Sequence, residues 1–96
     1  MKPSEALAAH RAGLRRLVSS YNVASPRVHG SVVAGTGTES SDLDLLVDPT
    51  GKTTLFTLAG LEHQAQALLG VRVLVLTPQF LPERFRADVL RVAEPL

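Results

Sequence analysis

The sequence predicts an α/β (α+β) fold, a small mixed sheet of about three strands flanked by helices in the order α-β-α-β-α-β-α. Two observations predict this architecture. Segments with apolar residues at helical spacing alternate with short apolar segments typical of strands. In addition, no repeat, low-complexity tract or linker interrupts the 96 residues, a length close to that of one ordinary domain. We therefore predict a single domain over residues 1–96.

The composition excludes several classes of protein. Ten Lys and Arg residues against nine Asp and Glu give a net charge of +1, so direct binding to nucleic acid is not expected. The absence of cysteine excludes disulfide scaffolds, cysteine zinc sites and thiol nucleophiles. His10 and Arg11 end the N-terminal apolar run too early for a signal peptide, and no apolar run is long enough to cross a membrane. We expect a soluble, cytoplasmic protein without a membrane partner.

The first element is a helix over residues 4–20, with Ser4 as its N-cap and Glu5 in the first turn. Its apolar residues at helical spacing are Leu7, Leu14, Leu17, Val18 and Tyr21. Three arginines lie on the other side of this helix, which we expect to face solvent: Arg11, Arg15 and Arg16.

The first strand is expected to be short. Pro26 does not fit the interior of a central strand, so the strand covers residues 27–29. A short helix over 31–34 follows. The remaining residues up to Ser41 are rich in glycine and hydroxyl side chains and predict a loop.

The second half of the chain predicts a strand over 42–47, a helix over 53–69 that Gly70 ends, and a strand over 71–76. In the first of these strands the side chains of Leu43, Leu45 and Val47 face one way. The side chains of Asp42, Asp44 and Leu46 face the other way. Pro78 or Pro82 opens a last helix, whose apolar residues are Leu81, Phe85, Val89 and Val92.

The segment from Gly30 to Val47 contains the residues that are best suited to bind a ligand or to take part in catalysis. Gly30 and Ser31 form a turn after a strand, where backbone N–H groups and a hydroxyl suit a phosphate. Asp42 and Asp44 project from one face of the next strand, and carboxylates so close repel unless a cation joins them. Mg²⁺ typically takes one or two carboxylates together with substrate phosphates. The combination predicts a magnesium–nucleotide site, whereas the aspartates alone are also typical of a solvated strand end.

This pattern resembles a known family. Gly30-Ser31, ten residues and then Asp42-x-Asp44 is similar to the signature of the DNA polymerase beta-like nucleotidyltransferases. The short length resembles the minimal nucleotidyltransferase (MNT) subgroup, and the ending, residues 89–96, is similar to the last helix of that subgroup. Further matching positions are Gly35, Ser41 and the apolar run 45–47.

The resemblance implies a role for each matching residue. Gly30, Ser31 and Ser41 would bind the nucleotide, while Asp42 and Asp44 would be the catalytic carboxylates that hold Mg²⁺. The implied reaction moves a nucleoside monophosphate from Mg-ATP, or another nucleoside triphosphate, to a hydroxyl on a partner protein. The implied partner is an HEPN-type ribonuclease toxin, which makes the chain antitoxin-like.

The sequence departs from the family at one position. The family carries a third carboxylate on the strand after the long helix, and Leu74 stands there, with no Asp or Glu between Glu62 and Glu83. The alternative is therefore a non-catalytic nucleotide-binding antitoxin module that neutralises an HEPN-type ribonuclease by binding alone. The intact Gly-Ser and Asp-x-Asp pattern favours the enzyme, and Leu74 favours the alternative.

Lys52 and His29 are two further polar residues beside predicted turns. Lys52 follows a strand and precedes a helix as in a P-loop, but Leu46 stands where that loop needs its first glycine, so Lys52 is predicted to be a surface turn residue. His29 lies beside the Gly-Ser turn. It is either a phosphate contact or a partly buried histidine at a strand end.

Overall fold

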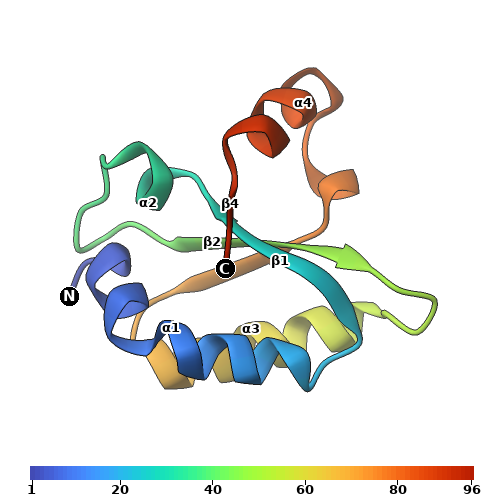
Figure 1. Ribbon diagram of the computed structural model, residues 1–96, viewed down its shortest axis with the longest axis horizontal. Helices are drawn as coiled ribbons and strands as arrows, with labels where there is room; N and C mark the ends of the chain where they lie inside the picture. The colour runs from blue at the N-terminus through green and yellow to red at the C-terminus, as the bar shows by residue number, and fades with distance from the viewer.

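The computed structural model describes residues 1–96, and its elements follow the predicted order with one added strand at the end (Figure 1). The elements are α1 (Pro3–Ser19), β1 (Val23–His29), α2 (Ser31–Ala34), β2 (Leu43–Pro49), α3 (Leu55–Leu69), β3 (Val73–Leu76), the 3-10 turn η1 (Pro78–Phe80), α4 (Glu83–Val92) and β4 (Glu94–Pro95). No helix is long and apolar enough to span a bilayer.

The strands form one mixed sheet in the order β3-β2-β1-β4, in which only β2 and β3 are parallel. Helices α1 and α3 cover one face of this sheet, while α2 and α4 stand on the opposite side (Figure 1). The predicted mixed α/β fold is confirmed, with four strands in place of about three.

The hydrophobic core lies between the sheet and the pair α1 and α3. As predicted, Leu43, Leu45 and Val47 point into this core and are fully buried. Because side chains alternate along a strand, Asp44 then points to the opposite face of the sheet. The core also contains Ala6, Leu7, Leu14, Val18, Val28, Leu58, Leu61, Ala65, Leu69, Val73, Val75 and Leu96. Leu46 shares this second face with Asp44 and is also fully buried, so the second face carries both polar and covered apolar side chains.

Strand β1 is longer than predicted. It begins at Val23 and includes Pro26, whereas the predicted strand began after this proline. The pairing of β1 with β2 shifts register between Ala24 and Arg27, which marks a bulge, and Ser25 has a positive φ of 48° there. A bulge leaves a residue out of the ladder, so the missing N–H of Pro26 costs no hydrogen bond.

The start of α1 also differs from the prediction. Pro3 is its first residue and Lys2 the N-cap, so Ser4 does not cap the helix. The carboxylate of Glu5 accepts a hydrogen bond from the Lys2 N–H over 3.0 Å. Proline suits the first helical position because its missing N–H has no partner there in any residue.

The predicted helical ending over 89–96 is confirmed as far as Val92 and is wrong for residues 93–96. The helix ends at Val92, and Glu94–Pro95 pair with β1 as a fourth strand. Pro95 explains the difference, since the residue before a proline disfavours helical backbone. Arg15 and Arg16 of α1 are exposed and Arg11 is half-buried, as expected for the solvent-facing side of the helix. Arg11 and Arg15 also donate hydrogen bonds to the Leu96 carbonyl oxygen over 2.9 and 2.7 Å, a contact that the sequence does not predict.

Strand β3 lies at an edge of the sheet, and two side chains of α3 cover its outward N–H groups. The N–H of Val73 donates to Gln66 Oε1 over 3.1 Å, and that of Val75 donates to Glu62 Oε2 over 2.9 Å. These bonds leave the outer edge of β3 without the free donors that would recruit another strand.

Candidate functional site

The register of the sheet brings the predicted site residues together on the face away from the core. His29 of β1 pairs with Asp44 of β2, and Asp44 pairs in turn with Leu74 of β3. Residues paired across neighbouring strands share a face. Gly30 and Ser31 follow β1 directly, so the predicted turn begins beside Asp44.

Gly30 and the Asp44 carboxylate are in close contact. The backbone of Gly30 has φ 75° and ψ −143°, a region that only glycine adopts readily. A Cβ atom at this position would overlap Oδ2 of Asp44. Glycine is therefore required twice, for its backbone conformation and for the space that the carboxylate occupies.

The hydroxyl of Ser31 lies inside the turn without a partner. Its Oγ is buried and makes no hydrogen bond. The loop after α2 packs against it, since a Cβ at Gly37 would lie 3.4 Å from this oxygen. A buried hydroxyl without a partner carries a desolvation cost, which a ligand oxygen or N–H can relieve.

Ser41 takes a different position from the other predicted residues. Its Oγ accepts a hydrogen bond from the Thr38 N–H over 2.9 Å, and its N–H donates to the Thr38 carbonyl over 3.1 Å. The Ser41 side chain therefore shapes the loop before β2. Its contact with a nucleotide stays a prediction.

Burial controls the charge of the His29 and Asp44 pair. Burial raises the pKa of the Asp44 carboxyl, which His29 partly offsets and Asp42 reinforces. Burial also lowers the pKa of His29, although Asp44 opposes this change. His29 as a residue is only 8% exposed, and its Nε2 has no hydrogen-bond partner. His29 is thus a buried histidine at a strand end. This was one of the two alternatives predicted for it, the other being a contact with a phosphate.

We expect Asp44→Asn to leave the free energy of unfolding unchanged or higher at pH 7 without divalent ions. A carboxyl whose folded pKa is raised stabilises the fold only while protonated, and this contribution is lost as pH rises through the folded pKa. The advantage of the variant should therefore shrink as pH falls below that pKa. Thermal melts in chelator from pH 7 to pH 4 measure it, and a large loss of stability at pH 7 would show that Asp44 is structural.

Asp42 forms an ion pair that the sequence analysis missed. Arg72 Nε lies 3.1 Å from Asp42 Oδ1, and Arg72 Nη2 lies 3.5 Å from Oδ2. Leu43 pairs with Val73 in the parallel ladder, which places the preceding residues, Asp42 and Arg72, side by side. The ion pair follows from the pairing of β2 with β3, and this register cannot be read from the sequence.

Leu74 faces the site, as the sequence analysis predicted for the position of the third carboxylate. It is paired with Asp44 and is 39% exposed, whereas its neighbours Val73 and Val75 are buried in the core. An apolar side chain beside Asp44 offers neither a metal ligand nor a proton acceptor.

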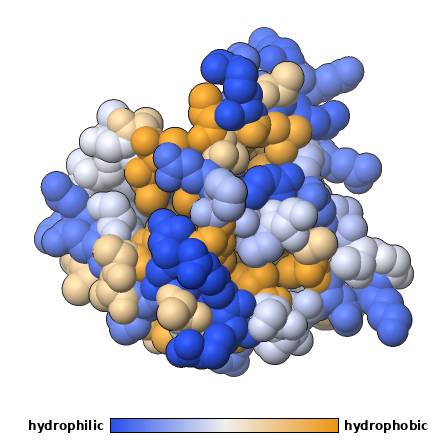
Figure 2. Space-filling view, in the orientation of Figure 1, coloured by the Kyte–Doolittle hydropathy of each residue, from blue (hydrophilic) through white to orange (hydrophobic).

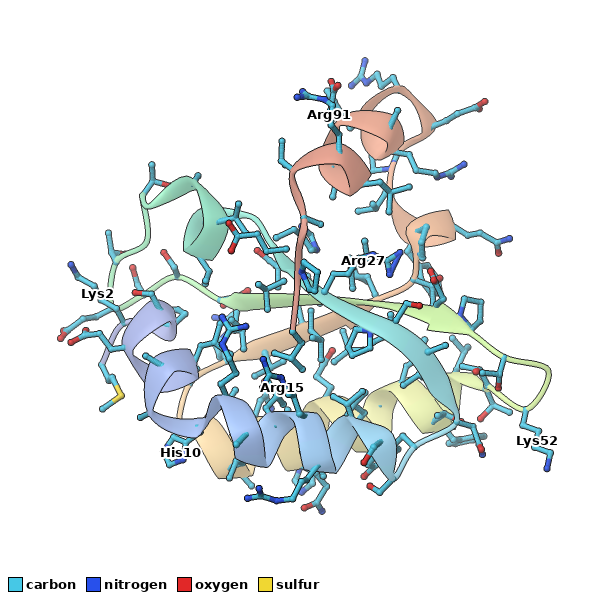
Figure 3. The ribbon with its side chains drawn as sticks, in the orientation of Figure 1. Lys2, His10, Arg15, Arg27, Lys52 and Arg91 are labelled. Atoms are coloured by element: carbon cyan, nitrogen blue, oxygen red, sulfur yellow. The ribbon has the colours of Figure 1, made fainter.

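A pocket of about 570 Å³ opens beside the Gly-Ser turn, between α2 and α4. Figure 2 shows apolar surface gathered in the hollow between these two helices. The pocket is lined by His29, Gly30, Ser31, Val33, Ala34, Thr36, Val89 and Val92. Lys52 lies at the opposite end of the molecule from α2, in an exposed turn after β2 (Figure 3), so it takes no part in this site.

The donor set fits Mg²⁺ held jointly with a phosphate ligand. Asp42 and Asp44 supply hard carboxylate oxygens on one strand, and the structure contains no cluster of three His, Cys, Asp or Glu residues that would hold a metal by itself. Mg²⁺ is commonly bound through one or two carboxylates with the rest of its shell from phosphates and water.

Comparison with known proteins places the chain in a family. Residues 8–93 match the nucleotidyltransferase domain. The chain is 36% identical over 85 residues to the protein adenylyltransferase MntA of Thermococcus cleftensis, covering 88% of this chain and 83% of that protein. It is 41% identical to a solved structure described as a minimal nucleotidyltransferase, with a TM-score of 0.85 over 97% of this chain and 95% of that one.

A crystal structure of the toxin–antitoxin MntA–HpeT shares the fold, with a TM-score of 0.72 and 16% identity over 90% of this chain and 70% of that one. The resemblance drawn from the Gly-Ser and Asp-x-Asp pattern is confirmed by these matches. The chain therefore belongs to the nucleotidyltransferase domain family.

Proposed function

We propose that this protein binds Mg-ATP, or another nucleoside triphosphate, and transfers its nucleoside monophosphate to a hydroxyl of a partner protein. The observation that carries the proposal is the Asp44 carboxylate lying against Gly30, beside the unpartnered hydroxyl of Ser31. A carboxylate that can bind a metal ion thus lies next to a turn that can bind phosphate. Membership in the nucleotidyltransferase family, and the name of the relative, an adenylyltransferase, support the proposal.

In this proposal one pair of residues binds the triphosphate and another pair binds the metal ion. Gly30 and Ser31 receive the triphosphate, because backbone N–H groups at the first turn of α2 have no acceptor within the helix. Asp42 and Asp44 hold the metal ion. Bound Mg²⁺ neutralises the charge that develops on the phosphates and orients them for attack. Ser41 also contacts the nucleotide in this proposal, from the loop before β2 in which its Oγ accepts a hydrogen bond from the Thr38 N–H.

The transfer itself is a displacement at the α-phosphorus. The acceptor hydroxyl oxygen forms a new bond to that phosphorus. The bond from the phosphorus to the oxygen bridging to the β-phosphate breaks, and pyrophosphate leaves with the electron pair. The hydroxyl proton passes to solvent or to a group of the acceptor, because Leu74 cannot accept it. General-base assistance usually contributes about 10²–10⁴-fold, so we expect slow transfer.

The partner in this proposal is an HEPN-type ribonuclease, with this chain as its antitoxin. Toxin–antitoxin complexes among the structures of the same fold support this choice. The exposed Leu74 beside Asp44 supports a second candidate, a module that binds nucleotide and neutralises the ribonuclease without transfer.

Calorimetry with ATP tests the binding step. We expect ATP to bind the wild type in the presence of Mg²⁺ and much more weakly in chelator. Asp42→Asn/Asp44→Asn should lose the Mg²⁺-dependent part, because one or two carboxylates are all that the chain offers the ion. Asp88→Asn, an exposed aspartate on α4 paired with Arg91, is the matched control. Equal binding by the wild type and the double variant would contradict the proposal.

A further inference from the structure

Arg72 is an exposed cation beside the first carboxylate of the site, Asp42. Its side chain is 79% exposed, and its hydrogen bonds and ion pair all go to Asp42. The two nitrogens face the two carboxylate oxygens in the forked arrangement that guanidinium groups form with carboxylates and phosphates. The guanidinium of Arg72 can therefore leave Asp42 without breaking another side-chain hydrogen bond or ion pair.

Two basic side chains of β1 near this face, Arg27 and His29, are already committed to the fold. Arg27 pairs with Asp48 over 2.9 Å, donates to the Ser25 carbonyl over 2.7 Å, and is only 18% exposed. His29 is buried at the end of β1, with only 8% of the residue exposed. Neither group is free to neutralise a ligand.

A bound triphosphate would carry negative charge that a single Mg²⁺ does not neutralise, and Arg72 can supply further positive charge. Two carboxylates suffice to share one Mg²⁺ with phosphates, but a second metal ion would have no protein carboxylate of its own, because Leu74 lies beside Asp44. One Mg²⁺ leaves a nucleoside triphosphate with an excess of negative charge. The guanidinium of Arg72, next to Asp42, is a source of positive charge directly beside the carboxylates that would hold the metal ion.

We propose that Arg72 is a substrate-binding residue that exchanges partners. Without a ligand its guanidinium occupies the Asp42 carboxylate, which the metal ion needs. When Mg²⁺ and a triphosphate bind, the guanidinium moves to the phosphate oxygens and acts as the second cation of the site. This inference rests on the proposed function, since it assumes that the ligand is a magnesium–nucleoside triphosphate.

Arg72→Gln should change two affinities in opposite directions. Mn²⁺ alone, followed by its electron paramagnetic resonance signal, should bind the variant more tightly, because Asp42 is freed from its competitor. Mg-ATP and Mg-tripolyphosphate, followed by calorimetry, should bind it about tenfold more weakly, because a charge-assisted hydrogen bond to phosphate is lost. A purely structural role would move both affinities in the same direction.

Two variants serve as controls. Arg72→Lys keeps the charge and should recover most of the Mg-ATP affinity. Arg91→Gln removes an exposed arginine that pairs with Asp88 on α4, and it should leave both affinities as in the wild type. Thermal melts of all three should match the wild type, because exposed ion pairs contribute little to stability.

The outcomes separate this inference from the function on which it rests. Unchanged or weaker Mn²⁺ binding in Arg72→Gln, or unchanged Mg-ATP binding, would overturn the role of Arg72 while the wild type still binds Mg-ATP. Failure of the wild type to bind Mg-ATP would instead overturn the proposed function. Opposite changes in the two affinities would support the exchange of partners.

Discussion

Gly30→Ala should lose Mg²⁺-dependent binding of ATP and lower the free energy of unfolding by about 2–4 kcal/mol. Both effects have the same cause. The backbone at position 30 has a conformation that strains any residue with a Cβ, and the added methyl group would displace the Asp44 carboxylate. Urea unfolding gives the stability change, and calorimetry gives the change in nucleotide binding.

Gly70→Ala is the matched control for this variant. Gly70 also has a positive φ, of 72°, but no atom lies within 4 Å of the position that a Cβ would take. It ends α3, away from the Gly-Ser turn. We expect the strain cost alone, about 1–2 kcal/mol, with nucleotide binding intact. Normal ATP binding by folded Gly30→Ala would contradict the close fit of Gly30 and Asp44.

Leu74→Asp should raise the rate of nucleotidyl transfer to the partner by about 10²-fold or more. The register places position 74 beside Asp44 on the site face, so the new carboxylate would add the missing metal ligand and proton acceptor. The side chain is partly exposed, which limits the cost to the fold to about 1 kcal/mol from repulsion between neighbouring carboxylates. The rate of label transfer from ATP to the partner protein measures the gain.

Leu74→Asn is the control for shape, because it introduces a polar side chain of the same size as aspartate without the charge. It should transfer no faster than the wild type. Fast transfer by the wild type, combined with unfolding of Leu74→Asp, would mean that Leu74 serves packing and that a different group accepts the proton.

The sequence predicted the site face because alternation along β2 is a local property. Leu43 and Leu45 are apolar and Asp44 is not, so which face each side chain takes follows from the strand itself. The end of α3 at Gly70 is predictable for a similar local reason, because glycine adopts the left-handed backbone conformation that commonly ends a helix.

The errors came from contacts between distant parts of the chain. Pro26 was excluded from β1 by a rule for regular strands, and only the bulge beside it makes it acceptable. The strand β4 exists because Glu94 meets Val28 across about two thirds of the chain, which no local pattern reveals. The pairing of Arg72 with Asp42 depends in the same way on the parallel register of β2 and β3.

The most direct test of the proposed function follows the fate of the α-phosphate. The protein is incubated with Mg²⁺ and its partner ribonuclease, and with ATP labelled at either the α- or the γ-phosphate. We predict that the α-label becomes bound to the partner, slowly and only with intact Asp42 and Asp44, while the γ-label leaves in pyrophosphate. Label on the partner from γ-labelled ATP, or α-label transfer that persists in Asp42→Asn/Asp44→Asn, would contradict the account.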